Sequence, residues 1–222
     1  MIKIKSNLDS IDLISGISVS ENQDQKEALQ SAIRSGRITS YFQPIVDLFT
    51  SSIYGYEMLA RGEGDFFNPG KMFEIAKDNE IEWELEYACR IAALNKICIL
   101  DGSFDDKYFF LNVSPNIFYT PEFQSGFTSK FIKEHGLNHR QIVLEITETA
   151  TIEQYDVFEK LIKHYVEQGF KVALDDFGAG HSGLTTLVAM TPHFMKIDRE
   201  IIDGIHKNPY KQKLLKTLCN FA

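Results

Sequence analysis

Two adjacent aspartates, Asp175 and Asp176, are the most informative residues of this sequence. They directly follow a short apolar run at 172–174 and come just before a glycine-rich turn at 178–180. That context places paired carboxylates at the C-terminal end of a strand, where like charges repel unless a cation lies between them. A divalent metal ion is the commonest such cation. For Asp176 alone, an Asx turn or a helix N-cap explains the residue equally well.

Other polar side chains recur where predicted strands end. The second predicted strand ends with Glu57 and Arg61, the third with Asn112, the fourth with Glu145 and Glu148, and the sixth with Lys196 and Asp198. Because the carboxyl ends of parallel strands meet at one edge of a sheet, these groups would converge on a single pocket. Carboxylate and amide oxygens there can hold a divalent metal, and a lysine can act as a base beside it.

The elements that must position these residues alternate along the chain. Apolar and aromatic runs bounded by turn residues predict six strands, at Ile38–Asp47, Ser52–Met58, Tyr108–Val113, Ile142–Thr147, Phe170–Leu174 and His193–Ile197. Helices are predicted at Asp24–Ser35, Lys71–Asn79, Glu82–Ile99, Pro121–Glu134, Glu153–Gln168, Ser182–Met190 and from Pro209 onward. The first two strands are close enough for an antiparallel hairpin, and the later ones require parallel pairing through crossovers. The sequence therefore predicts an α/β fold.

Composition narrows the functional classes. A chain of 222 residues with 44% hydrophobic content can bury one sizeable core. Its net charge of -8 argues against a protein that wraps a DNA or RNA polymer, which requires clustered Lys and Arg. A small anionic substrate is compatible with this charge if metal ions supply the positive charge.

The three cysteines, Cys89, Cys98 and Cys219, stand at no metal-ligand spacing and indicate a reduced, cytoplasmic chain. The first twenty residues contain no pattern typical of a signal peptide. No apolar run approaches the roughly 18 residues of a membrane helix. Residues 1–23 are weakly patterned and are predicted to form an N-terminal extension.

As an ordered set, these motifs resemble the EAL-domain family of cyclic-di-GMP phosphodiesterases, from about Gln30 to the end of the chain. The resemblance rests on the segments at 41–46 (YFQPIV), 57–61 (EMLAR), 112–114 (NVS), 145–148 (EITE), 175–182 (DDFGAGHS) and 196–198 (KID). The signature triplet is Glu57-Met58-Leu59 here, in place of Glu-Ala-Leu, and keeps its acid and its leucine.

The resemblance implies a modified TIM-type (β/α) barrel with one antiparallel strand, and metal-dependent hydrolysis of the bacterial second messenger cyclic di-GMP to linear pGpG. The Mg²⁺ or Mn²⁺ ligands that it implies, in a site for two metal ions, are Glu57, Asn112, Glu145, Asp175 and Asp176. Its implied catalytic residues are Lys196, Glu57, Asp175 and Glu148. Lys196 would help to deprotonate the attacking water, and Glu148 would hold the loop after Asp176. Its implied contacts with the guanine or phosphate of the nucleotide are Gln43, Leu59 and Arg61.

The sequence departs from the family pattern at its C-terminal end. Six strands are predicted, whereas a closed barrel of this kind needs eight and about 250 residues. We therefore expect residues 24–222 to be an EAL domain whose C-terminal part is missing, because the chain is truncated or proteolysed or because another chain fills the gap. An open sheet edge favours association, so a homodimer is a further expectation.

Purely structural roles remain open for several of these residues when each is considered alone. Arg61 would also fit a salt bridge with Glu63, Lys196 a structural lysine, Asn112 a turn residue, and Glu148 a helix cap. For the whole chain, the alternatives are a non-catalytic cyclic-di-GMP receptor, a glycosidase that uses paired carboxylates, or an interaction module without a reaction. The amide, twin aspartates and lysine together favour the phosphodiesterase over the glycosidase.

Overall fold

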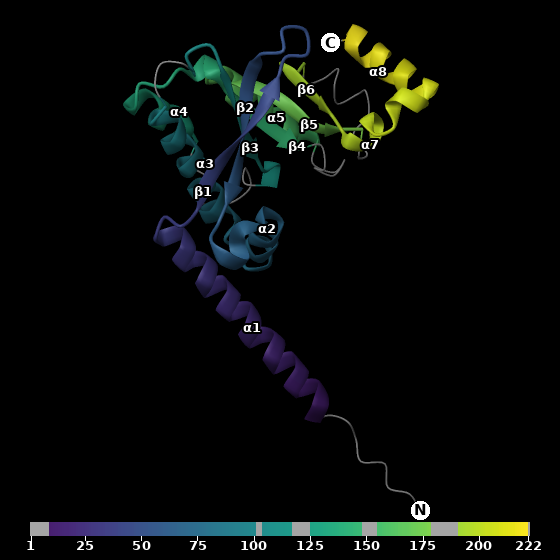
Figure 1. Cartoon of the computed structure of the whole chain (residues 1–222). Coiled ribbons are helices and arrows are strands. Elements are labelled where there is room, and N and C mark those ends of the chain that lie inside the picture. The colour runs from purple at the N-terminus through teal and green to yellow at the C-terminus, as the bar shows by residue number, and fades with distance from the viewer. Residues whose placement is uncertain (1–8, 101–103, 117–124, 148–154, 179–190, 222) are drawn as a thin grey trace, which may run out of the picture. The chain divides into compact units, whose positions relative to one another are not determined.

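The computed structural model of this chain describes residues 9–100, 104–116, 125–147, 155–178 and 191–221 (Figure 1). The chain divides into two compact units. The first comprises residues 1–40 and 60–92, and the second comprises residues 41–59 and 93–222. Within the described residues, no helix combines the length and the apolar character needed to cross a membrane.

The first unit is mainly helical and contains α1 (Asp9–Arg34), the short 3₁₀ helix η1 (Gly64–Phe67), α2 (Pro69–Asp78) and the start of α3 (Glu82–Cys98). Asn68 caps α2, because its side-chain oxygen accepts a hydrogen bond from the Gly70 amide at 2.9 Å. Apolar burial then joins α1 to α2 and α3. The buried residues of this core are Leu29, Ala32, Ile38, Met72, Ile75, Ala76, Ile81 and Leu85.

Helix α1 is longer than its sequence predicted. It begins at Asp9 rather than at Asp24 and ends at Arg34, one residue before the predicted end. The sequence contains no proline before Pro44, so nothing in the weakly patterned segment stops the helix from propagating toward the N-terminus. The boundary between an extension at 1–23 and a domain from 24 onward stays a prediction, and α1 runs across it.

The second unit contains most of a six-stranded sheet, whose strands follow one another in chain order from β1 to β6 (Figure 1). The strands are β1 (Thr39–Val46), β2 (Ile53–Arg61), β3 (Tyr108–Val113), β4 (Ile142–Thr147), β5 (Lys171–Phe177) and β6 (Phe194–Ile197). β2 to β6 pair in parallel. The turn at 47–52 reverses the chain between β1 and β2, which makes this pair antiparallel (Figure 1). The predicted α/β fold with one antiparallel strand is therefore confirmed.

Pro44 fits its place in β1. Proline has no amide hydrogen to donate to a neighbouring strand, and it is therefore confined to sheet edges and strand ends. β1 stands at one edge of the described sheet, so one side of this strand has no ladder to complete.

Most predicted helices are found close to their predicted bounds. α3 and α8 (Pro209–Phe221) begin where they were predicted, and α2 begins two residues early. α4 (Phe127–Glu134) and α5 (Tyr155–Glu167) match the described parts of their predicted segments. The helix predicted at Ser182–Met190 lies outside the described residues. Three further short helices are η4 (His139–Gln141), α7 (Arg199–Ile202) and η6 (Ile205–Lys207).

One apolar cluster of the sheet lies just before the polar site residues of its strands. Phe110, Val143 and Ala173 are buried there, and partly buried Tyr54, Tyr108 and Phe194 pack against them. The Lys171 ammonium donates a hydrogen bond to the Tyr108 hydroxyl at 2.6 Å and lies 4.2 Å from the centre of that ring. This apolar and aromatic layer directly precedes the polar site residues along these strands.

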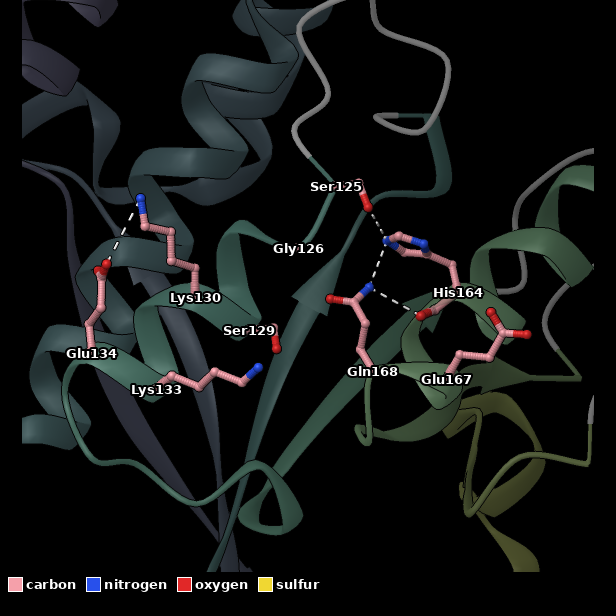
Figure 2. A pocket seen from close by; sticks show the side chains of 9 residues that line it. All are labelled: Ser125, Gly126, Ser129, Lys130, Lys133, Glu134, His164, Glu167 and Gln168. Atoms are coloured by element: carbon pink, nitrogen blue, oxygen red, sulfur yellow. Dashed lines mark hydrogen bonds and ion pairs between the residues drawn. The ribbon is translucent and has the colours of Figure 1, made fainter.

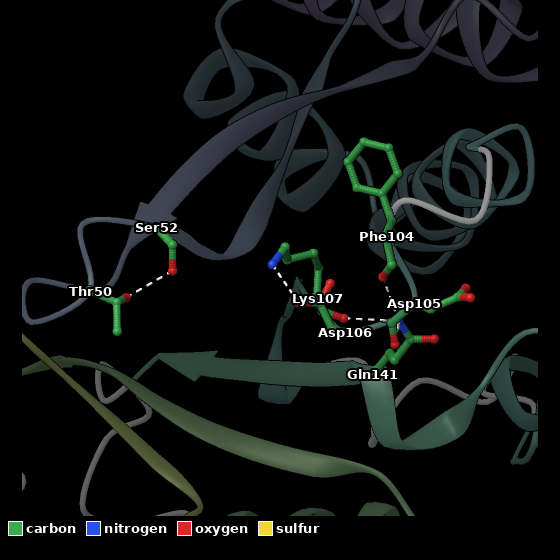
Figure 3. Close-up of polar contacts among 7 residues, drawn as sticks. All are labelled: Thr50, Ser52, Phe104, Asp105, Asp106, Lys107 and Gln141. Atoms are coloured by element: carbon green, nitrogen blue, oxygen red, sulfur yellow. Dashed lines mark hydrogen bonds and ion pairs between the residues drawn. The ribbon is translucent and has the colours of Figure 1, made fainter.

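Gln141 ties the entrances of β3 and β4 together (Figure 3). Its amide nitrogen donates to the backbone carbonyls of Phe104, Asp105 and Lys107, at 2.9, 3.1 and 3.0 Å. Two amide hydrogens serve three acceptors, so at least one hydrogen bond is shared. This contact supports a register in which Phe109 pairs with Ile142, and Asn112 therefore pairs with Glu145.

Replacing Gln141 with alanine should destabilise the protein by about 1–3 kcal/mol, because three carbonyls lose their side-chain donor. Gln141→Glu should cost more than Gln141→Ala, since a carboxylate would face three carbonyl oxygens. The free energy of unfolding in urea measures both effects. Equal stability of all three proteins would show that this contact does not support the sheet.

Candidate metal centre

Five neighbouring strands each carry one or two of the predicted metal ligands or the predicted catalytic lysine. Glu57 lies on β2, Asn112 on β3, Glu145 on β4, the twin aspartates on β5 and Lys196 on β6. The parallel register pairs Asn112 with Glu145, and Thr147 with Asp175. A run of short apolar strands, each ending in a polar residue, therefore brings these side chains to one edge of the sheet, as the sequence predicted.

Three carboxylates converge at that edge. Glu57, Glu145 and Asp175 each offer an oxygen atom, and these atoms all lie within 4.8 Å of one another. We call these three residues the carboxylate cluster. The amide nitrogen of Asn112 donates to Oε1 of Glu57 at 3.4 Å, which places the amide beside the cluster.

The Lys196 ammonium lies among the three acids. Its Nζ atom is 3.2 Å from Oε2 of Glu57, 2.9 Å from Oε1 of Glu145 and 3.0 Å from Oδ1 of Asp175. The sequence predicted a lysine near the acids, and the structure places it in contact with all three. The side chain of Lys196 is 28% exposed, so solvent reaches this part of the site.

Glu145 is the most deeply placed member of the cluster. Its side chain is fully buried, and within the described residues neither of its oxygens accepts a hydrogen bond, although Oε1 is ion-paired with Lys196. Burial raises the pKa of this carboxyl to about 8, Lys196 opposes the shift, and Glu57 and Asp175 add to it. One ammonium cannot neutralise three carboxylates, and the buried acid therefore takes up a proton most readily.

The two aspartates occupy different environments. Asp175 belongs to the carboxylate cluster, whereas Asp176 has a left-handed backbone with a φ of 53° and lies outside it. The Asp176 amide donates to Oδ1 of Asp175 at 2.9 Å. Burial raises the pKa of Asp176, and the nearby Asp175 and Asp198 carboxylates raise it further. The backbone of Asp176 thus departs from the extended conformation of the strand.

The structure says less about the residues predicted to contact the nucleotide than about the carboxylate cluster. Gln43 is exposed on β1, and Leu59 is half-buried on β2. Side chains alternate between the faces of a strand, so Leu59 and Arg61 share the β2 face that carries Glu57. Glu148 lies outside the described residues.

Arg61 does not form the alternative salt bridge within the described residues. Its guanidinium donates to the Ala60 carbonyl at 2.7 Å and lies 5.7 Å from the centre of the Phe67 ring, and no ion pair there joins it to Glu63. Asp198 has a local role that the sequence analysis did not assign, because its Oδ1 accepts a hydrogen bond from the Glu200 amide at 2.6 Å and caps α7. An Asp just before a short helix is the signal that could have indicated this cap.

A separate pocket of about 650 Å³ lies between α4 and α5 (Figure 2). Ser125, Lys133, His164 and Gln168 are among the residues that line it, and none of the predicted site residues does. The Gln168 amide nitrogen lies 2.7 Å from Nε2 of His164, and Ser125 Oγ lies 3.4 Å from the same atom. These polar groups therefore satisfy one another across the pocket wall.

The model of the EAL domain family matches residues 26–222 of the chain. This protein belongs to the EAL domain family. The match covers all six strands and every residue of the predicted site. The membership of the EAL family that the sequence motifs predicted is therefore confirmed.

EAL proteins of named function and structure are similar to this chain. The probable cyclic di-GMP phosphodiesterase PdeI of Escherichia coli is 31% identical over 183 residues, which are 80% of this chain and 23% of that protein. A standalone EAL protein of Vibrio cholerae, solved with c-di-GMP bound, is 27% identical with a TM-score of 0.71 over 83% of this chain and 76% of that one. Klebsiella pneumoniae BlrP1, solved as a manganese and cyclic di-GMP complex, is 27% identical with a TM-score of 0.72 over 82% of this chain and 45% of that one. The chain spans between 23% and 43% of the length of the curated relatives that it matches.

The donor set of this EAL domain fits a divalent metal. Mg²⁺ and Mn²⁺ prefer oxygen ligands, and the cluster offers three carboxylates with an amide beside them. Oε1 of buried Glu145 is ion-paired with Lys196, whereas Oε2 has no hydrogen-bond donor in the described residues, which is costly unless a cation compensates it.

The stability of the metal-free protein should fall as the pH rises from about 4.5 to about 8. The pKa of Glu145 is raised from 4.5 to about 8, so over this interval the folded chain holds a proton that the unfolded chain has released. The slope from one such proton is at most about 1.4 kcal/mol per pH unit. Urea unfolding in a chelator, at several pH values, measures it.

Glu145→Gln should make this slope shallower, since an amide does not titrate. Glu134→Gln is the matched control, because Glu134 is an exposed acid 3.9 Å from Lys130, and it should leave the slope unchanged. An unchanged slope in Glu145→Gln would exclude Glu145 as its source.

Proposed function

We propose that this chain hydrolyses one phosphodiester bond of cyclic di-GMP to give linear pGpG, and that the reaction depends on Mg²⁺ or Mn²⁺. The observation that carries the proposal is the convergence of three carboxylates on Lys196, with buried Glu145 oxygens that no described group satisfies by a hydrogen bond. The names of the similar EAL proteins support the substrate, and the BlrP1 complex supports manganese.

Glu57, Glu145 and Asp175 are the proposed metal ligands of the cluster, joined by Asn112 and Asp176 in a site for two ions. Asp175 and Asp176 suit two ions because Asp175 belongs to the carboxylate cluster and Asp176 lies outside it. When bound, such ions neutralise charge on the phosphate oxygens and lower the pKa of a water molecule. A net charge of -8 makes that neutralisation necessary for an anionic substrate.

Lys196 is proposed to accept the proton of the attacking water at Nζ. Burial lowers the pKa of this lysine, but its ion pairs with Glu145, Glu57 and Asp175 outweigh burial and raise it above its ordinary value. When other cations bind those carboxylates, burial is the remaining influence on Lys196 and lowers its pKa. The neutral amine of Lys196 then becomes accessible. Lys196 thus acts as a base only in the loaded site.

Arg61, Leu59 and Gln43 are proposed to position the nucleotide. The planar guanidinium of Arg61 can donate two parallel hydrogen bonds to a phosphate, and a lysine cannot reproduce that geometry. Leu59 offers an apolar surface to a guanine, and Gln43 offers an amide. Glu148 is proposed to hold the loop after Asp176.

Three expectations about the setting of the enzyme stay predictions. These are a cytoplasmic location, association into a homodimer, and completion of the barrel by residues of another chain. A non-catalytic cyclic-di-GMP receptor is the alternative that the following experiment separates from the enzyme.

Incubation of the chain with cyclic di-GMP and Mn²⁺ should yield pGpG, and EDTA should abolish the product. Glu57→Gln should lower kcat by more than about hundredfold, because changes even to groups that merely support a ligand cost 10–100-fold. Exposed Glu134→Gln should retain full activity. Chromatographic separation of the nucleotides measures all three.

Binding of cyclic di-GMP without hydrolysis, in the presence of Mn²⁺, would support the receptor and contradict the enzyme. Hydrolysis that persists in EDTA would contradict the metal requirement.

A further inference from the structure

The Lys196 ammonium stands where a cation bound by the carboxylate cluster would stand. Its three contacts, at 3.2, 2.9 and 3.0 Å, are with one oxygen each of Glu57, Glu145 and Asp175. Those three residues are also the ones whose oxygens converge to within 4.8 Å. The lysine and a metal ion therefore require the same three carboxylates.

No other positive group in the described residues neutralises this cluster. The Asn112 amide donates one hydrogen bond to Glu57 and carries no charge. Oε1 of Glu145 has only its ion pair with Lys196 there, and Oε2 has no hydrogen-bond donor. Without the ammonium, the remaining charged carboxylates of the cluster would repel one another at short range, partly out of water.

Lys196 is also carried by the strand best able to release it. β6 is four residues long, stands at an edge of the described sheet, and has no fully buried residue. Its pairing with β5 is irregular between Leu174 and Phe177. By contrast, β4, which carries Glu145, is buried over five of its six residues. Glu145 therefore lies on a well-buried strand, whereas Lys196 lies on a short edge strand that is only partly buried.

We propose that Lys196 is an internal counter-cation that occupies the carboxylate cluster until a divalent metal ion displaces it, and that it thereby sets the metal affinity of the site. This inference rests on the proposal that the cluster binds a divalent metal. The lysine keeps the acids together in the metal-free protein and competes with the ion for the same three carboxylates.

The competition has a calculable effect. A ligand that binds only the fraction of molecules whose site is open has its apparent affinity reduced by that fraction. If the ammonium occupies the cluster in about nine molecules of ten, removing it should tighten metal binding about tenfold.

The test is isothermal titration of the chelator-treated protein with MnCl₂, without any nucleotide. Lys196→Met keeps the length of the side chain and removes its charge, and it should bind Mn²⁺ about tenfold more tightly than the unaltered chain. Lys213→Met is the matched control, because it removes the same charge from an exposed position on α8 and should change the affinity by less than about twofold.

Equal or weaker Mn²⁺ binding by Lys196→Met would overturn the displacement and leave the metal site standing. Absence of Mn²⁺ binding by every protein would overturn the metal site, and with it both this inference and the metal-dependent hydrolysis. Because no substrate is present, loss of hydrolysis in the variant does not affect the result.

A second measurement needs no variant and therefore covers the case in which Lys196→Met does not fold. Crystal structures of the unaltered chain with EDTA and with Mn²⁺ should place Nζ of Lys196 among the three carboxylates in the first. In the second, the ion should take its place, and Nζ should lie farther than 4 Å from at least two of the acids. Three unchanged contacts beside a bound ion would refute the inference.

Discussion

Electrostatic repulsion at the carboxyl ends of adjacent strands is the constraint on which this structure depends. Three acids converge there, and one of them is fully buried. Apolar burial next to these acids supplies stabilising energy, because Phe110, Val143 and Ala173, each two residues before a polar site residue of its strand, form an apolar core with aromatic side chains around it. Apolar burial is the dominant favourable term in folding, and it can hold unfavourable groups in place nearby. Each of these strands therefore combines apolar residues that stabilise the sheet with a polar residue that destabilises it.

The register of the strand pairs brings the acids together in one site. Asn112 lies beside Glu145, and Thr147 beside Asp175, only if each parallel pair starts at the right residue. A slip by one residue would turn every side chain of a strand to the other face. Gln141 secures the start of one pair through three backbone carbonyls (Figure 3). The far ends of the strands thus determine which acids meet.

The sequence predicted the strands and the acids well because both depend on local patterns. Apolar runs that end in polar residues gave six strands, and parallel pairing then required Glu57, Glu145 and Asp175 to converge. The long start of α1 was missed because a weakly patterned segment can continue a helix that tertiary packing nucleates. The triple contact of Lys196 could not be predicted, since it depends on an irregular pairing of β5 with β6. The difference between Asp175 and Asp176 was hidden as well, because it arises from one backbone angle.

That angle limits how the site can evolve. A φ of 53° at Asp176 is tolerated by Gly, Asn and Asp far better than by other residues, and it is especially unfavourable for β-branched ones. Genetic drift at this position is therefore channelled toward asparagine and glycine, neither of which carries a charge. A lineage that stopped using the acid would keep the bend and lose the carboxylate. Descendants would consequently diverge in chemistry at this position long before they diverged in shape.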